Sequence, residues 1–289
     1  MKRFFILASA AIVALASCAK TEVVYNDAPE QIAFKQITGA MTKATTTPLE
    51  GGHLGVFAEM DGEVYFGNTR FGWVGSSYAN SGKYWPYDGD LDFTVYYPYV
   101  DGAEYAGNVL TIPGVIADEA LYYGSQRYID TEKGTGTVSV VLQHVSAMIQ
   151  VQDGITGDLY TLKSVVLADA PTSGDVTVTY DANGLNPAVA TKTGFTKSSK
   201  TCIETEVVDE TPTLKYSDVY VLPNQQTYFT VTFVQKAGGA EYEKDVPLST
   251  TWDANKKYIY TLGVAGADHI YFTASVEEFS TVISTPTVN

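Results

Sequence analysis

The sequence predicts an all-β protein built from two β-sandwich domains in tandem. Runs of alternating apolar and polar residues recur along the chain, and Asp-Gly, Asn-Gly and Gly-Gly pairs typical of tight turns separate them. Tyr and Phe are abundant, with 21 and 12 residues, which favours strands over helices. At about 150 residues per domain, the length of 289 residues corresponds to two domains.

The expected strands follow one another along the chain with period two and many β-branched or aromatic residues. The clearest runs cover residues 31–37, 91–97, 175–180, 227–234, 257–262 and 269–276. One helical turn is expected at residues 117–123.

The composition excludes several classes of function. The chain has 18 Lys and Arg against 33 Asp and Glu, a formal net charge of -15, whereas a nucleic-acid-binding protein needs a positive field. We therefore expect no nucleic-acid partner and interpret the acidic bias as a solvated surface. Three His and two Cys leave little material for a metal cage, so no metal or cofactor is expected. No G-x-S-x-G, H-E-x-x-H, Walker or C-x-x-C motif occurs, and we predict that the protein is not an enzyme.

The N-terminus, residues 1–17, is predicted to be a signal peptide. Lys2 and Arg3 precede an apolar run over residues 4–15, which is too short for a permanent transmembrane helix. The run ends in Leu-Ala-Ser before Cys18, which resembles the lipobox of bacterial lipoproteins, where the Cys is lipidated and becomes the first residue. Ordinary cleavage near Ala16 is the alternative. Lipidation would anchor the chain in outer-membrane lipid through Cys18 and leave Cys202 unable to form an internal disulfide.

Four segments follow from these observations. After the signal peptide, residues 18–43 form a tether and an N-terminal strand, and residues 44–152 form the first domain. A polar link with glycines at 152–158 separates it from the second domain, residues 158–289.

Only four residues stand out as candidate binding or catalytic groups. His144 lies in the middle of a predicted strand, where a structural role is more common than that of a base or ligand. Trp73, Trp85 and Trp252 are candidate carbohydrate platforms, although aromatic core is the more common role. Exposure of two or more of them in one groove would favour glycan binding.

Several separated segments together resemble the fimbrillin family, the two-domain lipoprotein pilins of type V pili. They lie in the family's order, from the lipobox through the first strand and the Thr-Lys-Ala stretch to the last strand. The matching segments are residues 15–18, 31–37, 42–44, 55–58, 83–86, 91–98, 144–151, 221–223, 252, 257–262 and 270–279.

The resemblance implies a fold and a life history. Family members are two transthyretin-like β-sandwich domains, exported as lipid-anchored precursors to the outer membrane and cell surface. A protease removes the N-terminal strand, and a strand of another pilin subunit fills the vacated groove, which builds a pilus that supports cell adhesion. The alternative is a non-polymerising glycan-binding lipoprotein of the cell surface, and an enzyme ranks third.

The resemblance also assigns the residues of assembly. Ile32 and Phe34 would belong to the removable strand, although a permanent edge strand is the alternative. The maturation protease would cut between Lys43 and Ala44, with Arg70 as the other candidate site.

The last ten residues contain good strand formers and no charge. Val282, Ile283 and Val288 are therefore expected to provide a donor strand for a neighbouring subunit. Pro286 cannot donate a ladder hydrogen bond, and a frayed terminus is the alternative.

Lipidation at Cys18 is directly testable. Cells that express the chain should incorporate palmitate into the wild-type protein and not into Cys18→Ala, because the thiol is the acceptor. Labelling is measured on the immunoprecipitated chain, and equal label in the two proteins would contradict the prediction.

Overall fold

The computed structural model describes residues 30–39, 51–130, 137–155, 159–184, 186–208, 211–223, 228–248, 251–266 and 269–278. These residues form strands, turns and irregular segments, and none of them is helical. The expected all-β class is confirmed.

The helical turn expected at residues 117–123 was wrong. Only the backbone N–H of Glu119 closes a turn, onto the carbonyl of Ile116 at 3.1 Å. Tyr122 and Tyr123 instead begin a strand, because they pair with His144 and Gln143 across the sheet. Tertiary pairing therefore overrides the short local pattern.

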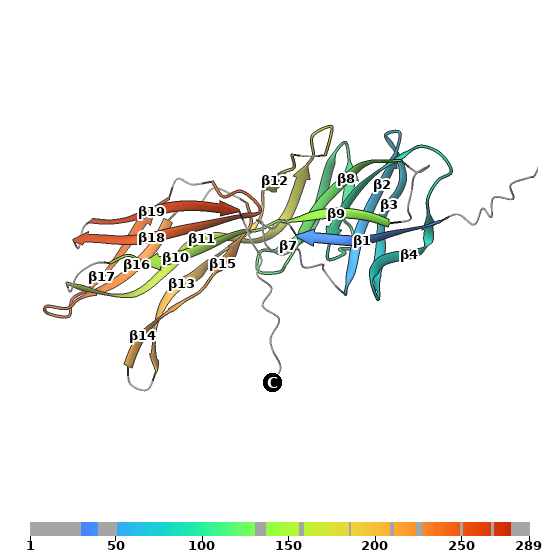
Figure 1. Ribbon diagram of the computed structural model, residues 1–289. Coiled ribbons are helices and arrows are strands. Elements are labelled where there is room, and N and C mark those ends of the chain that lie inside the picture. Colours follow the sequence, from blue (N-terminus) through green and yellow to red (C-terminus); the bar gives the residue numbers. More distant parts are fainter. Residues whose placement is uncertain are drawn as a thin grey trace, which may run out of the picture.

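The N-terminal half is a closed ring of seven paired strands, seen at one end of the molecule in Figure 1. In ring order the strands are β1 (Gln31–Gly39), β4 (Ser77–Tyr84), β3 (Glu63–Val74), β2 (His53–Met60), β5 (Asp90–Tyr97), β8 (Tyr122–Asp130) and β9 (Thr137–His144). All neighbours are antiparallel except β1 and β9, which run parallel. Alternate residues of these strands point inward and form one apolar core, as period-two patterning requires.

The C-terminal half consists of two sheets that share a core. One sheet has the order β15 (Val219–Val221), β10 (Ala147–Asp153), β18 (Lys256–Gly266) and β19 (His269–Glu278). The other contains β14 (Thr211–Tyr216), β13 (Thr196–Val208), β11 (Tyr160–Thr179), β16 (Tyr228–Gln235) and β17 (Glu241–Pro247). Buried residues of both sheets, among them Ile149, Val165, Phe229 and Tyr260, form a single cluster.

Strand β11 joins the two halves. Its first part pairs with β16, while its last part pairs with β7 (Val109–Ile116) and β12 (Ala188–Thr191); β6 (Glu104–Ala106) in turn pairs with β7. A third apolar cluster lies here and combines ring residues such as Phe57 and Tyr96 with Val176 and Val178 of β11. A continuous strand and a shared core therefore hold the halves together.

The chain changes sheet earlier than the boundary expected at residues 152–158. Strand β9 belongs to the ring, whereas β10 pairs with β15 and β18. Only Val145 and Ser146 separate these two strands, and both are buried. The expected polar link marks the end of β10 instead. The limits 44–152 and 158–289 of the two β-sandwich domains remain predictions.

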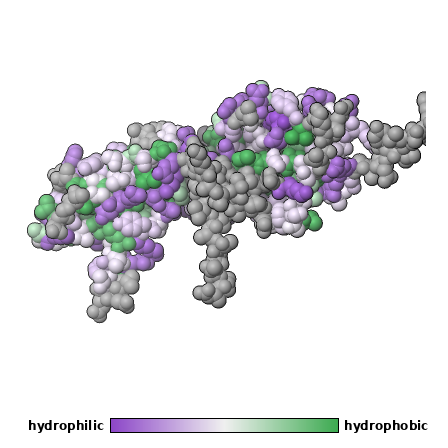
Figure 2. All heavy atoms as spheres, viewed as in Figure 1, coloured by the Kyte–Doolittle hydropathy of each residue, from purple (hydrophilic) through white to green (hydrophobic). Residues whose placement is uncertain are grey.

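The surface is mixed in polarity. Figure 2 shows hydrophilic residues spread over the visible face, with hydrophobic residues in separate smaller patches. Within the described part of the chain, no helix offers the length and hydropathy needed to cross a bilayer.

Burial in the core shared by the two halves should decide how much a substitution on β7 lowers the free energy of unfolding. Ile112 is fully buried and Ile116, on the same strand, is 43% exposed. Ile112→Ala should lower the free energy of unfolding by about 2–5 kcal/mol through lost transfer energy and a residual cavity. Ile116→Ala should cost less than about 1 kcal/mol, because water already reaches its side chain. Urea unfolding measures the free energy of unfolding of both variants. Equal losses would contradict the burial of β7 between the two halves.

Candidate functional site

Strand β1 and the surface that receives it form the candidate functional site. The β1 seat consists of Phe71, Tyr78, Phe93 and Val138, which belong to β3, β4, β5 and β9. Phe34 packs edge-to-face against Phe71 and Phe93, with ring centroids 5.2 and 5.4 Å apart. Such edge-to-face pairs align the positive edge of one ring with the negative face of another. Phe34 therefore anchors β1 in the ring core.

The alternation of residues in β1 explains why it lies in this place. Ile32 and Phe34 have no exposed surface, whereas Lys35 is exposed. Burial of Ile32 and Phe34 contributes about 1.5–3 kcal/mol for each side chain. The structure thus places both expected residues of the N-terminal strand in the core.

The backbone of β1 is held on both sides. It pairs antiparallel with β4, where Ala33 faces Ala79, and parallel with β9 from Ala33 to Gly39. The carbonyl of Glu30 also accepts a hydrogen bond from the backbone N–H of Trp85 at 2.9 Å. Neither neighbour is the next strand in sequence, so no hairpin connects β1 to its partners. Non-covalent contacts alone join β1 to β4 and β9.

Removal of β1 would change the ring in two ways. It would uncover the apolar side chains of the β1 seat, and it would leave β4 and β9 as edges with unpaired backbone groups. Such an edge is a template for an incoming strand. The open seat would then match the shape of β1 itself, an extended segment with apolar side chains at alternate positions.

The tryptophans do not form an open binding groove. Trp85 and Trp252 are 7% and 1% exposed and belong to different core clusters. Trp73 is half-buried and packs against Tyr78 at a centroid distance of 5.0 Å. The indole N–H of Trp252 donates to the hydroxyl of Tyr260 at 2.9 Å. Their common role is aromatic core, which removes the feature on which a tryptophan-based glycan site would depend.

His144 is a structural residue at the end of β9. The centroid of its ring lies 4.2 Å from that of the Tyr122 ring. Its backbone N–H donates to Oδ1 of Asn255 at 3.2 Å. Burial lowers the pKa of the imidazole from 6.5 to about 4, so the ring is neutral at physiological pH. The described residues contain no cluster of three or more His, Cys, Asp or Glu that could hold a metal ion.

Other expected site residues divide into two groups. One group lies outside the described residues and remains a set of predictions: Cys18, Lys43, Ala44, Val282, Ile283 and Val288. Arg70, the second candidate cleavage site, lies inside β3 and pairs with Gly55 of β2, so cleavage there would first require local unfolding. Cys202 is buried as a free thiol, and burial raises its pKa to about 12, which makes it unreactive.

Sequence reasoning missed the residues that receive β1. Phe71, Tyr78 and Val138 lie in segments that the sequence pattern does not connect to residues 31–37. Their hydrophobic character is visible in the sequence, but the order of strands around the ring is not.

The chain was compared with protein families, curated proteins and solved structures. The sequence model of the fimbrillin-like family matches residues 38–279. No curated protein matches.

Among solved structures, a fimbrial protein from Bacteroides vulgatus has a TM-score of 0.56 and 14% identity, over 85% of this chain and 100% of the other. A candidate cell adhesion protein from Bacteroides uniformis has a TM-score of 0.52 and 21% identity, over 87% and 100%. A further candidate cell adhesion protein, from Bacteroides ovatus, has a TM-score of 0.54 and 13% identity, over 88% and 99%. At these identities the likeness shows a common fold.

The buried imidazole of His144 predicts a loss of stability in acid. Its pKa is 6.5 when exposed and about 4 in the folded chain, so the unfolded state binds more protons between these values. Neutral His144 therefore contributes to the free energy of unfolding above the higher pKa. This contribution is lost as the pH falls, by about 2 kcal/mol from about pH 7 to about pH 5.

Urea unfolding at the two pH values measures this change, and His144→Gln should reduce it. Replacement of the exposed His269 by Gln is the matched control and should leave it intact. The same pH dependence in His144→Gln and in the wild type would contradict the assignment.

Proposed function

The chain belongs to the fimbrillin-like family, and we propose that it is a structural subunit of a type V pilus. It is exported as a lipoprotein, trimmed by a protease at the cell surface and polymerised by strand exchange into a fibre that supports adhesion. Its two halves correspond to the two transthyretin-like sandwich domains of such pilins. No catalytic step belongs to this role.

The attachment of β1 carries the proposal. This strand fills an apolar groove between β4 and β9 and has no hairpin link to either. A single cut between β1 and β2 would turn it into a separate peptide held by side-chain packing and hydrogen bonds. A second strand of similar pattern can then compete for the seat, because backbone pairing requires no particular side chains.

The sequence offers a candidate cleavage site between β1 and β2. The bond between Lys43 and Ala44 lies after Gly39, the last residue of β1, and before His53, the first residue of β2. A protease that prefers Lys or Arg would separate β1 from the rest of the chain there. Cleavage at Arg70 would instead separate β2 and two thirds of β3 from the rest of the ring.

The C-terminal segment is the proposed donor. Strand β19 ends at Glu278, and the uncharged residues 280–289 follow it. The donor strand would carry Val282 and Val288 on one face and Ile283 on the other, and the face that enters the seat of the next subunit would replace Ile32 and Phe34 there. Before assembly, lipid on Cys18 would hold the precursor in the outer membrane, with the residues up to Pro29 as a tether.

Cleavage after Lys43 predicts the N-terminal residue of the subunits in the fibres. Subunits in purified fibres should begin at Ala44, as measured by N-terminal mass spectrometry. Lys43→Ala should accumulate as the lipidated precursor and form no fibres, because β1 remains attached. Arg70→Ala is the matched control and should assemble normally.

Fibres whose subunits begin at Cys18 would contradict trimming as the trigger of assembly. A chain that ends at Phe279 separates the donor role from the trimming step. It should still be cleaved at Lys43 but should not assemble, and normal fibres from this chain would contradict the donor role.

A further inference from the structure

A polar cleft with a volume of about 500 Å³ opens where the ring meets the C-terminal sheets, and the proposed assembly does not use it. We name it the junction cleft and define it by Gln143, Asn186, Ala188, Val189, Asp253 and Lys256. These residues come from β9, from β12 and the loop before it, and from the turn that enters β18. The volume lies in the range of roughly 300–1,000 Å³ that small-molecule sites occupy.

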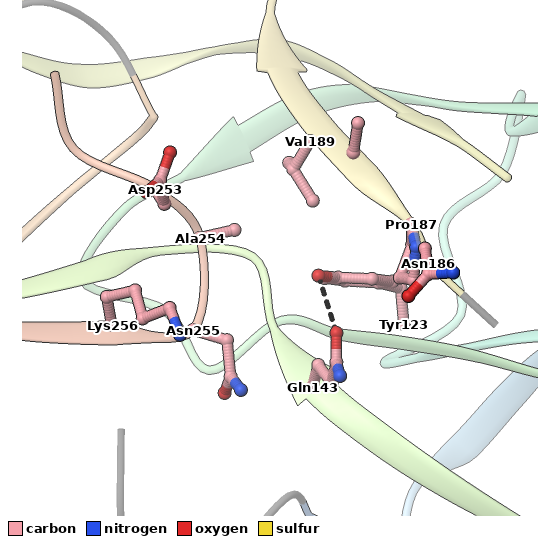
Figure 3. A pocket seen from close by; sticks show the side chains of 10 residues that line it. Tyr123, Gln143, Asn186, Pro187, Val189, Asp253, Ala254, Asn255 and Lys256 are labelled. Carbon is pink, nitrogen blue, oxygen red and sulfur yellow. Dashed lines mark hydrogen bonds between the residues drawn. The ribbon is translucent and has the colours of Figure 1, made fainter. Parts of the chain in front are cut away.

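Hydrogen bonds to neighbouring side chains hold two polar groups of the cleft in place. The hydroxyl of Tyr123 donates to Oε1 of Gln143 at 2.9 Å, the dashed line in Figure 3. Since a side-chain amide has one oxygen and one NH₂ group, this bond fixes the Gln143 amide with its NH₂ as the remaining donor. On the same side of the cleft, Nδ2 of Asn186 donates to Asp181 at 2.8 Å, which leaves Oδ1 of Asn186 as an acceptor.

The opposite wall is the turn that carries Asp253 and Lys256 (Figure 3). Asn255 fixes this turn with a left-handed backbone, φ 58°. Its backbone N–H donates to the carbonyl of Ser146 at 3.2 Å, and its Oδ1 accepts from the backbone of His144 at 3.2 Å. Asp253 and Lys256 are therefore presented by a rigid support.

The charges and apolar groups of the cleft select the chemistry of its ligand. Asp253 and Lys256 contribute one negative and one positive charge, so the cleft has no net charge of its own. The acidic chain as a whole repels anions. Val189 and Ala254 provide an apolar strip between the polar walls and pack against the core shared by the halves. Hydroxyl groups, which both donate and accept, fit the polar walls, and a C–H face fits the apolar strip.

We propose that the junction cleft binds a neutral oligosaccharide through one or two hexose units. Gln143 and Lys256 donate to sugar hydroxyls, Asn186 and Asp253 accept from them, and the strip of Val189 and Ala254 contacts the ring C–H groups. This site is separate from the tryptophans. Tyr123, its only aromatic residue among those described, is 2% exposed and offers no stacking face.

Without a stacked aromatic ring, each cleft binds weakly, in the millimolar range. If the chain polymerises as proposed, the cleft recurs along the fibre, and many weak sites act together on a glycan-covered surface. Binding to a single chain does not depend on polymerisation. A failure of the cleft is therefore distinguishable from a failure of the pilus role.

The test is saturation-transfer NMR of the purified full chain with lactose, maltose, cellobiose and N-acetyllactosamine as probes. At least one should bind. Ala188→Trp, which fills the cleft from an exposed position, should weaken binding at least about tenfold. Ala190→Trp, two residues along the same strand and outside the cleft, is the control and should change it less than about twofold.

A second pair of variants tests the cleft in case the tryptophan variant does not fold. Lys256→Met should weaken binding, whereas Lys257→Met, whose side chain lies beside Glu277, should not. Thermal melts establish that each variant is folded. The proposal is overturned if none of the four disaccharides binds, if cleft and control variants have equal effects, or if 3′-sialyllactose binds more tightly than lactose.

Discussion

The fold depends on one strand that closes a ring without being tied to its neighbours. Strand β1 fills the space between β4 and β9 and buries Ile32 and Phe34 in the core. With β1 in place the ring has no free edge, and without it two edges and an apolar groove face solvent. Backbone pairing and an alternating pattern are all that the seat requires. The constraint is therefore on the kind of strand that fills the seat.

The position of β9 connects this seat to the rest of the molecule. The strand passes through Val145 and Ser146 directly into β10, which pairs in parallel with β18, and β18 pairs with β19. A strand seated beside β9 is thus joined by continuous backbone and ladder hydrogen bonds to the end of β19. In a fibre, tension between acceptor seat and donor tail would run along these strands, while β11 and the shared core keep the two halves aligned.

The period-two pattern of the sequence was sufficient to predict the all-β class and the burial of Ile32 and Phe34, because alternation is a local property of each strand. Pairing is not local. The parallel neighbours β1 and β9 are about a hundred residues apart, and nothing in either segment specifies the other. The change of sheet at Val145 could not be predicted from the sequence either, since His144, Val145 and Ser146 are buried and contain no Gly, Pro, Asn or Asp that would indicate a turn. The junction cleft could not be predicted either, because Gln143, Asn186 and Asp253 share no spacing and meet only through the fold.

The most direct test of the account is to lock β1 to β4. Ala33 and Ala79 face each other across the two strands, so Ala33→Cys combined with Ala79→Cys can form a disulfide there. After cleavage at Lys43, the oxidised protein should retain β1 and form no fibres, and a reducing agent should restore assembly to the level of the Ala33→Cys single variant. Fibres that form equally well from the oxidised and the reduced protein would show that β1 does not leave its seat, and would contradict strand exchange at this site.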